Sequence, residues 1–457
     1  MIGMMKKAFP WKTKRKQIVY NAFRPYGGDG ILRIKKAQNC AFSNGTLQTG
    51  LAIEPCFSLA GNTVEKVNYS NAIAVWPLRF LQEDGITLKE QISVLSNTGF
   101  LYFYDETTKT LTNKIRPGDQ TNAVYLRSPT GEQKWLFVGD RGVWLMDEEF
   151  SIQKQTAIKD VSGALCVCKN RAFLGKKMGK VLYSSPLVPW DFGATIDDGG
   201  EIVLPLSAGT PVGLAAVEDY VYIFCLKEIY RLRVAGSARD FRLERIPYDG
   251  EEICCGSFGV VEKGVIFLSC GGLWKVTDKK VKRICSYLNV NPMSADNRCQ
   301  CAVGEGSYFL RYRETMTQRK TLAVDTDGEN GYDCRDMETI GNAFGKMVFL
   351  YNGMLYSFHK KGENSAAIST FTYKCESEET DFGISGKKLL KKLTFYGEGA
   401  FTVGVYCDGK YHERTAVFED GVAEVDFNAR GERFSFVFIL QNGCEIRQVS
   451  VTLETLS

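Results

Sequence analysis

The chain has 457 residues, 44% of them hydrophobic, and a formal net charge of +4. This length is too great for one small core and suits two structural units. The small net charge excludes a chain that binds nucleic acid over its whole surface, so any such contact must come from a local patch. With 28 Phe, 21 Tyr and 45 Gly against 12 Pro, the composition favours strands joined by glycine turns.

The spacing of the 15 cysteines does not indicate a metal site or a disulfide framework. None lies in a CxxC motif, and no pair of motifs has zinc-site spacing, so we interpret them as small buried side chains in a reducing compartment. The first 16 residues lack the apolar segment of a signal peptide, and no apolar run is long enough to cross a bilayer. We therefore expect a protein that is made in a cytoplasm and does not contact a membrane.

Residues 1–16 form a basic segment without any acidic residue. Its cations and its single tryptophan are Lys6, Lys7, Trp11, Lys12, Lys14, Arg15 and Lys16. One interpretation is a solvated, flexible terminus. The sharper one is an arm that docks on a partner protein or on phosphates.

A repeated pattern follows the basic segment: an apolar strand, a tight turn that often contains Gly, and a second alternating strand. The clear copies lie at 92–105, 135–147, 172–183, 221–232, 265–276 and 347–358, and a degenerate copy lies at 308–324. A spacing of ~40 residues is typical of propeller blades. We therefore predict an all-β chain with a β-propeller of six or seven blades over 17–384. The alternative, two unrelated β-sandwiches, needs no regular spacing.

The tail, 385–457, differs from the repeat. It opens with the pairs Lys387–Lys388 and Lys391–Lys392, and then alternating apolar positions recur at 401–405 and 434–438. Short strands at regular spacing predict a small C-terminal β-sandwich.

The residues that most enzymes need are scarce in this chain. His359 and His412 are the two histidines, and each follows a predicted strand or turn, so we interpret both as non-catalytic. The acidic segment 325–330 lacks the glycine that a calcium loop requires at its sixth position, and 197–201 is best interpreted as a turn rather than as a glycosidase carboxylate pair. We predict no catalytic residue, no metal and no cofactor.

Three segments resemble propeller proteins of bacteriophage tails, and in particular the packaged-DNA stabilisation (head-to-tail connector) family of short-tailed phages. They are VLYSSPLVPWDF at 181–192, PVGLAAVEDYVYIF at 211–224 with IYRL at 229–232, and TDFG at 380–383 with the following lysine pairs. The resemblance implies a ring of identical subunits that closes or extends the portal channel. It also implies contacts with a portal or adaptor protein and other tail proteins, and possible DNA in the lumen.

The leading functional prediction is therefore a structural virion protein of the head-to-tail connector or tail tube, assembled in the host cytoplasm. The second is a propeller adhesin or baseplate component that binds a host glycan or protein. The third is a glycan-processing propeller enzyme, which would need two convergent carboxylates on the propeller axis. Fold alone does not choose among them.

Overall fold

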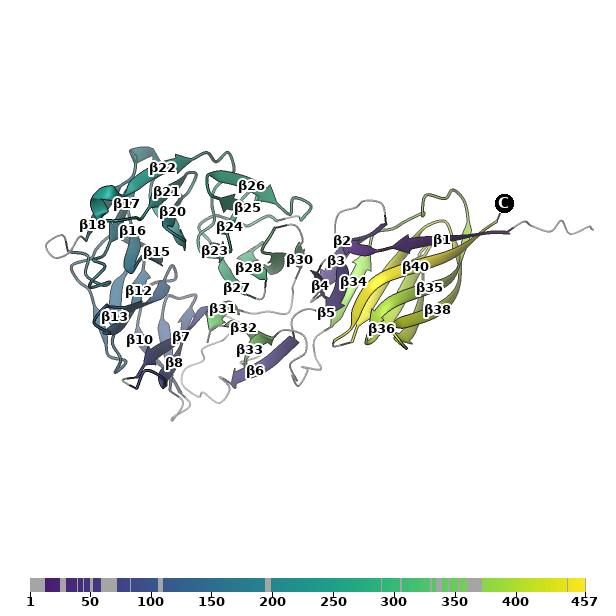
Figure 1. Cartoon of the computed structure of the whole chain (residues 1–457), viewed down its shortest axis with the longest axis horizontal. Coiled ribbons are helices and arrows are strands. Elements are labelled where there is room, and N and C mark those ends of the chain that lie inside the picture. Colours follow the sequence, from purple (N-terminus) through teal and green to yellow (C-terminus); the bar gives the residue numbers. More distant parts are fainter. Residues whose placement is uncertain are drawn as a thin grey trace, which may run out of the picture. The chain divides into compact units, whose positions relative to one another are not determined.

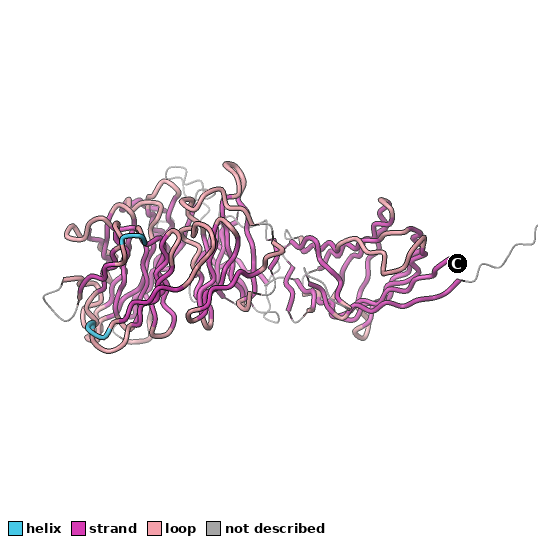
Figure 2. The backbone as a smooth tube through the Cα atoms, turned by 90° about the horizontal axis from the view of Figure 1, so that it is seen from above, coloured by secondary structure: helices cyan, strands magenta, loops and turns pink. Residues whose placement is uncertain are grey.

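The computed structural model describes residues 13–24, 30–38, 40–43, 45–49, 52–58, 72–82, 84–105, 110–193, 199–288, 290–304, 306–328, 331–333, 339–343, 346–351, 354–359, 372–441 and 443–456. By its internal contacts the chain divides into two units. The propeller unit comprises Glu54–Gly331 and Arg335–Phe358, and the sandwich unit comprises Met1–Ile53, Tyr332–Cys334 and His359–Ser457. Strands dominate the described backbone of both units, as Figure 2 shows.

Within the described residues, the propeller strands form six four-stranded sheets and one further run of four paired strands, β27 to β30, and we number these seven groups as blades in chain order (Figure 1). Blade 1 contains β7 Ala72–Leu81, β8 Leu88–Ser96, β9 Leu101–Asp105 and β10 Thr110–Ile115. Blade 2 contains β11 Asn122–Arg127, β12 Gln133–Gly139, β13 Gly142–Met146 and β14 Ile152–Lys154. Blade 3 contains β15 Val161–Cys168, β16 Arg171–Lys176, β17 Lys180–Tyr183 and β18 Gly200–Val203.

The remaining blades follow the same order. Blade 4 contains β19 Pro211–Val217, β20 Tyr220–Cys225, β21 Ile229–Arg233 and β22 Arg242–Ile246. Blade 5 contains β23 Gly259–Val261, β24 Gly264–Ser269, β25 Gly272–Thr277 and β26 Lys280–Ile284. Blade 6 contains β27 Gln300–Gly304, β28 Ser307–Arg313, β29 Arg319–Asp325 and β30 Gly331–Asp333. The described chain also contains two short 3-10 helices: η2 Leu206–Ala208 lies between blades 3 and 4, and η3 Ala238–Asp240 lies between β21 and β22 of blade 4.

Blade 7 closes the ring with a strand from far away in the sequence. It consists of β31 Thr339–Ala343, β32 Lys346–Tyr351, β33 Met354–His359 and, on the outside, β6 Ala52–Ser58. Figure 1 shows β6, in purple, beside β33, in green. Because β31 also contacts β7 of blade 1, the seventh blade joins both ends of the propeller sequence.

The repeated hairpins of the sequence are the second and third strands of the blades, including the degenerate copy, which is β28 and β29. These strands are buried on both faces because a neighbouring blade covers each face. In β24 every residue is buried. Aromatic side chains join adjacent blades: Phe103 of blade 1 meets Phe137 of blade 2 edge to face, with ring centres 6.3 Å apart. The predicted β-propeller is confirmed, and it has seven blades.

The sandwich unit contains two sheets, and strands from the N-terminal and C-terminal parts of the chain contribute to both of them. The first sheet contains β1 Thr13–Tyr20, β4 Cys40–Ser43, β5 Thr46–Thr49, β35 Lys388–Glu398, β38 Val422–Gly431 and β40 Glu445–Leu456. The second contains β2 Ala22–Arg24, β3 Ile31–Gln38, β34 Tyr373–Ser377, β36 Ala400–Cys407, β37 Lys410–Val417 and β39 Phe434–Leu440. Figure 1 shows β1, in purple, along the yellow β40.

In the sandwich unit, β38 alternates strictly between buried and exposed residues, unlike the central strands of the blades. In β38, Ala423, Val425, Phe427 and Ala429 are buried and the residues between them are exposed, because only one face of the sheet meets the other sheet. Phe395 of the first sheet packs edge to face against Phe401 and Phe438 of the second, at 4.7 and 6.2 Å between ring centres. These contacts hold the two sheets together.

The division of the chain differs from the predicted boundaries of 16 and 384. Strands β1 to β5 were assigned to an arm and a propeller, but they pair within the sandwich unit, where all eight residues of β1 pair with β40. The sandwich also begins earlier than residue 385, since β34 is one of its strands. The repeat could not reveal this, because β1, β3 and β5 pair with strands several hundred residues away.

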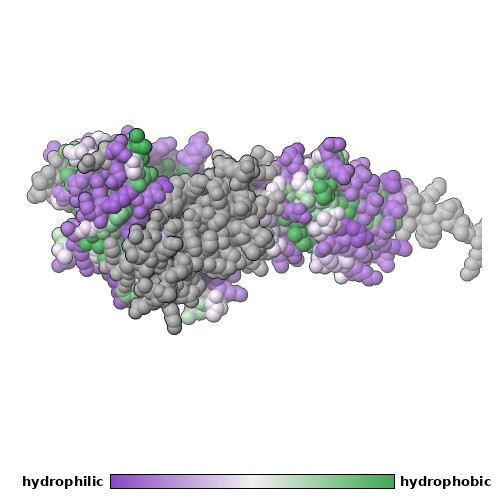
Figure 3. Space-filling view, turned by 90° about the horizontal axis from the view of Figure 1, so that it is seen from below, coloured by the Kyte–Doolittle hydropathy of each residue, from purple (hydrophilic) through white to green (hydrophobic). Residues whose placement is uncertain are grey.

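Where the surface in Figure 3 is coloured, it is mostly hydrophilic on both units, with small hydrophobic patches. Helices with the length and apolar character needed to span a lipid bilayer do not occur in the described part of the chain.

Candidate anion-binding site

The first strands of the blades surround an internal cavity on the propeller axis. Its volume is about 240 Å³, and its walls come from β7, β11, β15, β19, β27 and β31, together with residues just before β23. A second cavity of about 190 Å³ shares Ile73, Arg298 and Gln300 with the first. Loops that precede a first strand, or that join a second strand to a third, line this second cavity, so it opens on one face of the propeller.

Four arginines line the second cavity, which we call the arginine pocket: Arg298, Arg311, Arg313 and Arg319. Arg298 precedes β27, Arg311 and Arg313 end β28, and Arg319 begins β29. Residues Asp119 and Asp296 supply the two carboxylates of its lining. Among the described lining residues, four guanidinium groups and two carboxylates have formal charges that sum to +2.

The strand register places three of these arginines on one face of blade 6. Arg313 lies directly opposite Arg319, and Arg311 is two residues before Arg313 and so points to the same side. Like charges directly opposite each other on a sheet are destabilising. Neither Arg313 nor Arg319 forms an ion pair with another described residue. Burial and the neighbouring charge of Arg313 lower the pKa of Arg319.

Arg298 joins blade 6 to blade 2 across the axis. Its Nη2 donates to Oδ1 of Asn122 at 3.1 Å, while its Nε is buried and donates no hydrogen bond. Nearby, Nε2 of Gln120 reaches the carbonyl oxygen of Asp296 at 3.5 Å, also between these two blades. Burial lowers the pKa of Arg298. A partly buried guanidinium whose described hydrogen-bond acceptor is a neutral amide is poorly compensated.

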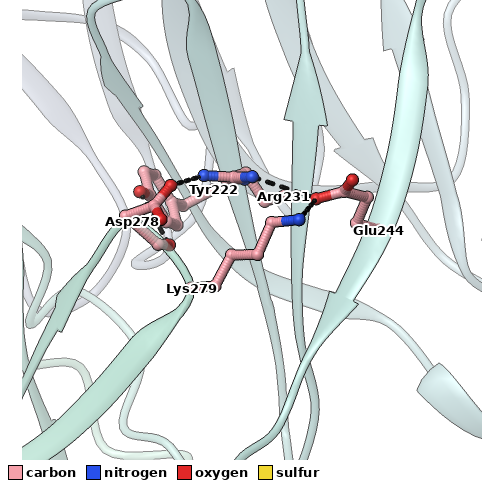
Figure 4. A network of polar contacts seen from close by, with 5 residues as sticks. All are labelled: Tyr222, Arg231, Glu244, Asp278 and Lys279. Atoms are coloured by element: carbon pink, nitrogen blue, oxygen red, sulfur yellow. Dashed lines mark hydrogen bonds and ion pairs between the residues drawn. The ribbon is translucent and has the colours of Figure 1, made fainter.

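The same propeller contains a second buried arginine, Arg231, whose positive charge is balanced by carboxylates (Figure 4). Arg231 of blade 4 is 6% exposed and forms ion pairs with Glu244 at 3.0 Å and with Asp278 of blade 5. Although burial works against its charge, its hydrogen bonds to these carboxylates raise the pKa of Arg231. Tyr222 donates to the Asp278 carbonyl oxygen at 3.1 Å, and Lys279 pairs with Glu244 at 3.0 Å. This network is structural, because two carboxylates balance the charge of Arg231 without a ligand, although its Nε, like that of Arg298, donates no hydrogen bond to a described residue.

The chemistry of the arginine pocket suits binding better than catalysis. Guanidinium groups bind carboxylate and phosphate oxygens with two parallel hydrogen bonds. Histidine, cysteine and serine do not occur among the described residues that line it. Asp119 and Asp296 are both exposed, whereas a glycosidase needs one carboxyl group whose surroundings keep it protonated. In the described part of the chain, no group of three or more His, Cys, Asp or Glu could hold a metal ion.

The predicted docking residues lie elsewhere, in the sandwich unit. Lys6, Lys7, Trp11 and Lys12 are outside the described residues. Lys14, Arg15 and Lys16 are exposed, but they belong to β1 and pair with β40, so this part of the basic segment is a strand and not a free arm.

Of the other residues considered, His412 is half-buried in β37, and the side chain of His359 at the end of β33 is outside the described part. Asp197 and Asp198 are also outside it, and Asp325 begins a turn closed by Gly328 N–H donating to its carbonyl oxygen at 2.9 Å.

The sequence analysis did not find the arginine pocket. Its local signal is the segment LRYRETMTQRK at 310–320, in which arginines alternate on one strand and return at the start of the next. That signal alone cannot separate a pocket from a solvated strand end, because part of the lining comes from Ile73 and Asp119, which are about 200 residues away or more.

No protein-family model matches the chain, and no curated protein matches it. Among solved structures, the chain is similar to a streptogramin B lyase, with 12% identity, a TM-score of 0.41 and coverage of 67% of this chain and 97% of that one. It is also similar to virginiamycin B lyase from Staphylococcus aureus, with 10% identity, a TM-score of 0.42 and coverage of 67% and 99%. These likenesses transfer neither an activity nor a ligand to this chain.

Proposed function

We propose that this chain is a binding protein and not an enzyme, and that its propeller holds an anionic group of a partner molecule in the arginine pocket. The observation that carries the proposal is the contrast between two arginine sites of one propeller. Arg231 has two carboxylate partners, whereas Arg313 and Arg319 face each other without an ion pair to a described residue. An anion between them would convert a repulsion into two attractions.

The structural alternative is that the pocket is an ordinary solvated end of blade 6. Arg233 and Arg242 of blade 4 are also directly opposite each other, so an arginine pair by itself is not a binding site. Both of those arginines are exposed, however, and water screens them. Arg313 and Arg319 are half-buried beside a cavity. The difference in burial supports a ligand at blade 6 and none at blade 4.

The test is thermal unfolding of the full chain in sodium phosphate and in sodium glutarate, at constant ionic strength. A bound anion raises the midpoint in a saturable way, by mass action. We expect this rise in the natural chain and in an Arg233→Met/Arg242→Met control, but not in an Arg313→Met/Arg319→Met variant. Equal, unsaturable rises in all three proteins would mean that the anions act on the solvent and that the pocket binds nothing.

The virion role is a separate proposal, supported by the resemblance of 181–192, 211–224 and 380–383 to phage tail proteins. A binding face fits both a connector that contacts a portal and an adhesin that contacts a host molecule. Mass spectrometry of purified virions of a phage that encodes this chain, with the copy number per virion, would decide it. Absence from the virion would remove both virion roles while leaving the anion-binding proposal intact.

A further inference from the structure

The arginine pocket has room for one anionic group and not for a whole ligand. Its volume is about 190 Å³. Sites for drug-sized molecules are larger, ~300–1,000 Å³. A partner that places one group in the pocket must therefore lie with its other parts on the surrounding surface.

Two exposed methionines lie in the otherwise polar segments next to the arginines of the pocket. Met316 lies in the loop between Arg313 and Arg319 and is 75% exposed. Met293 is 45% exposed, and its N–H donates to the carbonyl oxygen of Arg313 at 2.9 Å. We call these two side chains the methionine rim. Methionine is flexible and polarisable and is frequent at surfaces that bind varied partners.

From these contacts, and resting on the proposed function, we infer that the partner is a protein segment in which an aspartate or glutamate is flanked by apolar side chains. The carboxylate would enter the arginine pocket, and the apolar neighbours would cover the methionine rim. The net charge of +2 complements an acidic segment. A glycan or a nucleic acid could supply the anion. Proteins usually bind the sugar rings and bases of such ligands by stacking exposed aromatic side chains on them, whereas the side chains of the methionine rim are thioethers.

The test selects short random peptides on the full-length chain, with counter-selection on the Arg313→Met/Arg319→Met variant. Peptides that survive depend on the pocket. We expect them to carry an acidic residue next to aliphatic residues or Met, and to bind Met293→Ser/Met316→Ser at least about tenfold more weakly. The matched control is Ile86→Ser, an 85% exposed apolar side chain on a loop between first and second strands, at the opposite face. It should bind like the natural chain.

The outcomes separate the two proposals. If phosphate or glutarate binds in the pocket but no peptide survives counter-selection, the inference of a protein partner fails and the anion site stands. Survivors without the acidic and apolar pattern, or unaffected by the methionine substitutions, overturn the inference as well. An anionic oligosaccharide or a single-stranded oligonucleotide that displaces the selected peptides and binds more tightly would also overturn it. If no anion binds in a pocket-dependent way, the proposed function itself fails.

Discussion

Replacing Arg319 by Met should stabilise the propeller when no anion is present. The side chain keeps most of its aliphatic length, but the charge opposite Arg313 is removed. For two guanidinium groups ~7 Å apart, Coulomb's law gives a repulsion of about 2.4 kcal/mol at an effective dielectric of ~20 and about 0.6 kcal/mol in water. Because both side chains are half-buried at the mouth of a cavity, we expect a gain of about 1 kcal/mol in the free energy of unfolding.

The tryptophans allow this gain to be measured on the propeller alone. Five of the six tryptophans belong to the propeller unit: Trp76, Trp135, Trp144, Trp190 and Trp274. In a Trp11→Phe background, fluorescence therefore follows the unfolding of this unit. For a unit of roughly 300 residues, a gain of about 1 kcal/mol raises the midpoint by about 1–2 °C. The gain should shrink at ~1 M salt, where the screening length falls to ~3 Å.

The control is Arg242→Met, which removes one member of the exposed pair Arg233–Arg242. Because water and salt already screen that pair, the change should stay within about 0.5 kcal/mol. If Arg319→Met instead lowers the midpoint by several degrees in low salt, then Arg319 stabilises the propeller through its charge. The arginine pocket would then be a structural element, and the proposed function would lose its basis.

Three further predictions concern stability and reactivity. Arg231→Met should lower the unfolding free energy of the propeller by about 1–3 kcal/mol, at the low end for a buried pair because its partners are exposed. Lys279 and Arg231 lower the pKa of Glu244, so the stabilisation by this network is fully present above pH 4.5 and is lost as the pH falls through the lowered pKa. A pH series of fluorescence midpoints should therefore show the natural chain and the Arg231→Met variant becoming equal in stability in acid. Deleting residues 1–16 removes half of β1 from β40, and should make the sandwich unit protease-sensitive while leaving the tryptophan-reported midpoint unchanged; a drop in that midpoint would contradict it. Burial raises the pKa of the Cys166 and Cys375 thiols, so neither should react with an aromatic disulfide reagent until denaturant unfolds its unit, and rapid labelling of either in the native chain would contradict their burial.

The sequence by itself determined the blades, because each central hairpin is a local unit. Its two strands are joined by a tight turn, and burial of the second strand on both faces requires a continuous apolar run, as at 172–174 and 265–268. The strict alternation of the tail likewise predicted a sandwich with one solvent face. Both features depend on neighbours within about 15 residues, so a pattern in the sequence can record them.

The tertiary structure alone decided where the units end and where the candidate site lies. Strand β1 pairs with β40 more than 400 residues later, and β6 pairs with β33 to complete blade 7. The local sequences of β1 and β6 do not indicate which strands they pair with. The arginine pocket depends on non-local contacts in the same way. Arg313 and Arg319 belong to one hairpin, but burial makes their repulsion significant, and that burial comes from loops of other blades. Charge can be read from a sequence, whereas the solvent exposure of that charge follows from which distant segments the ring brings beside it.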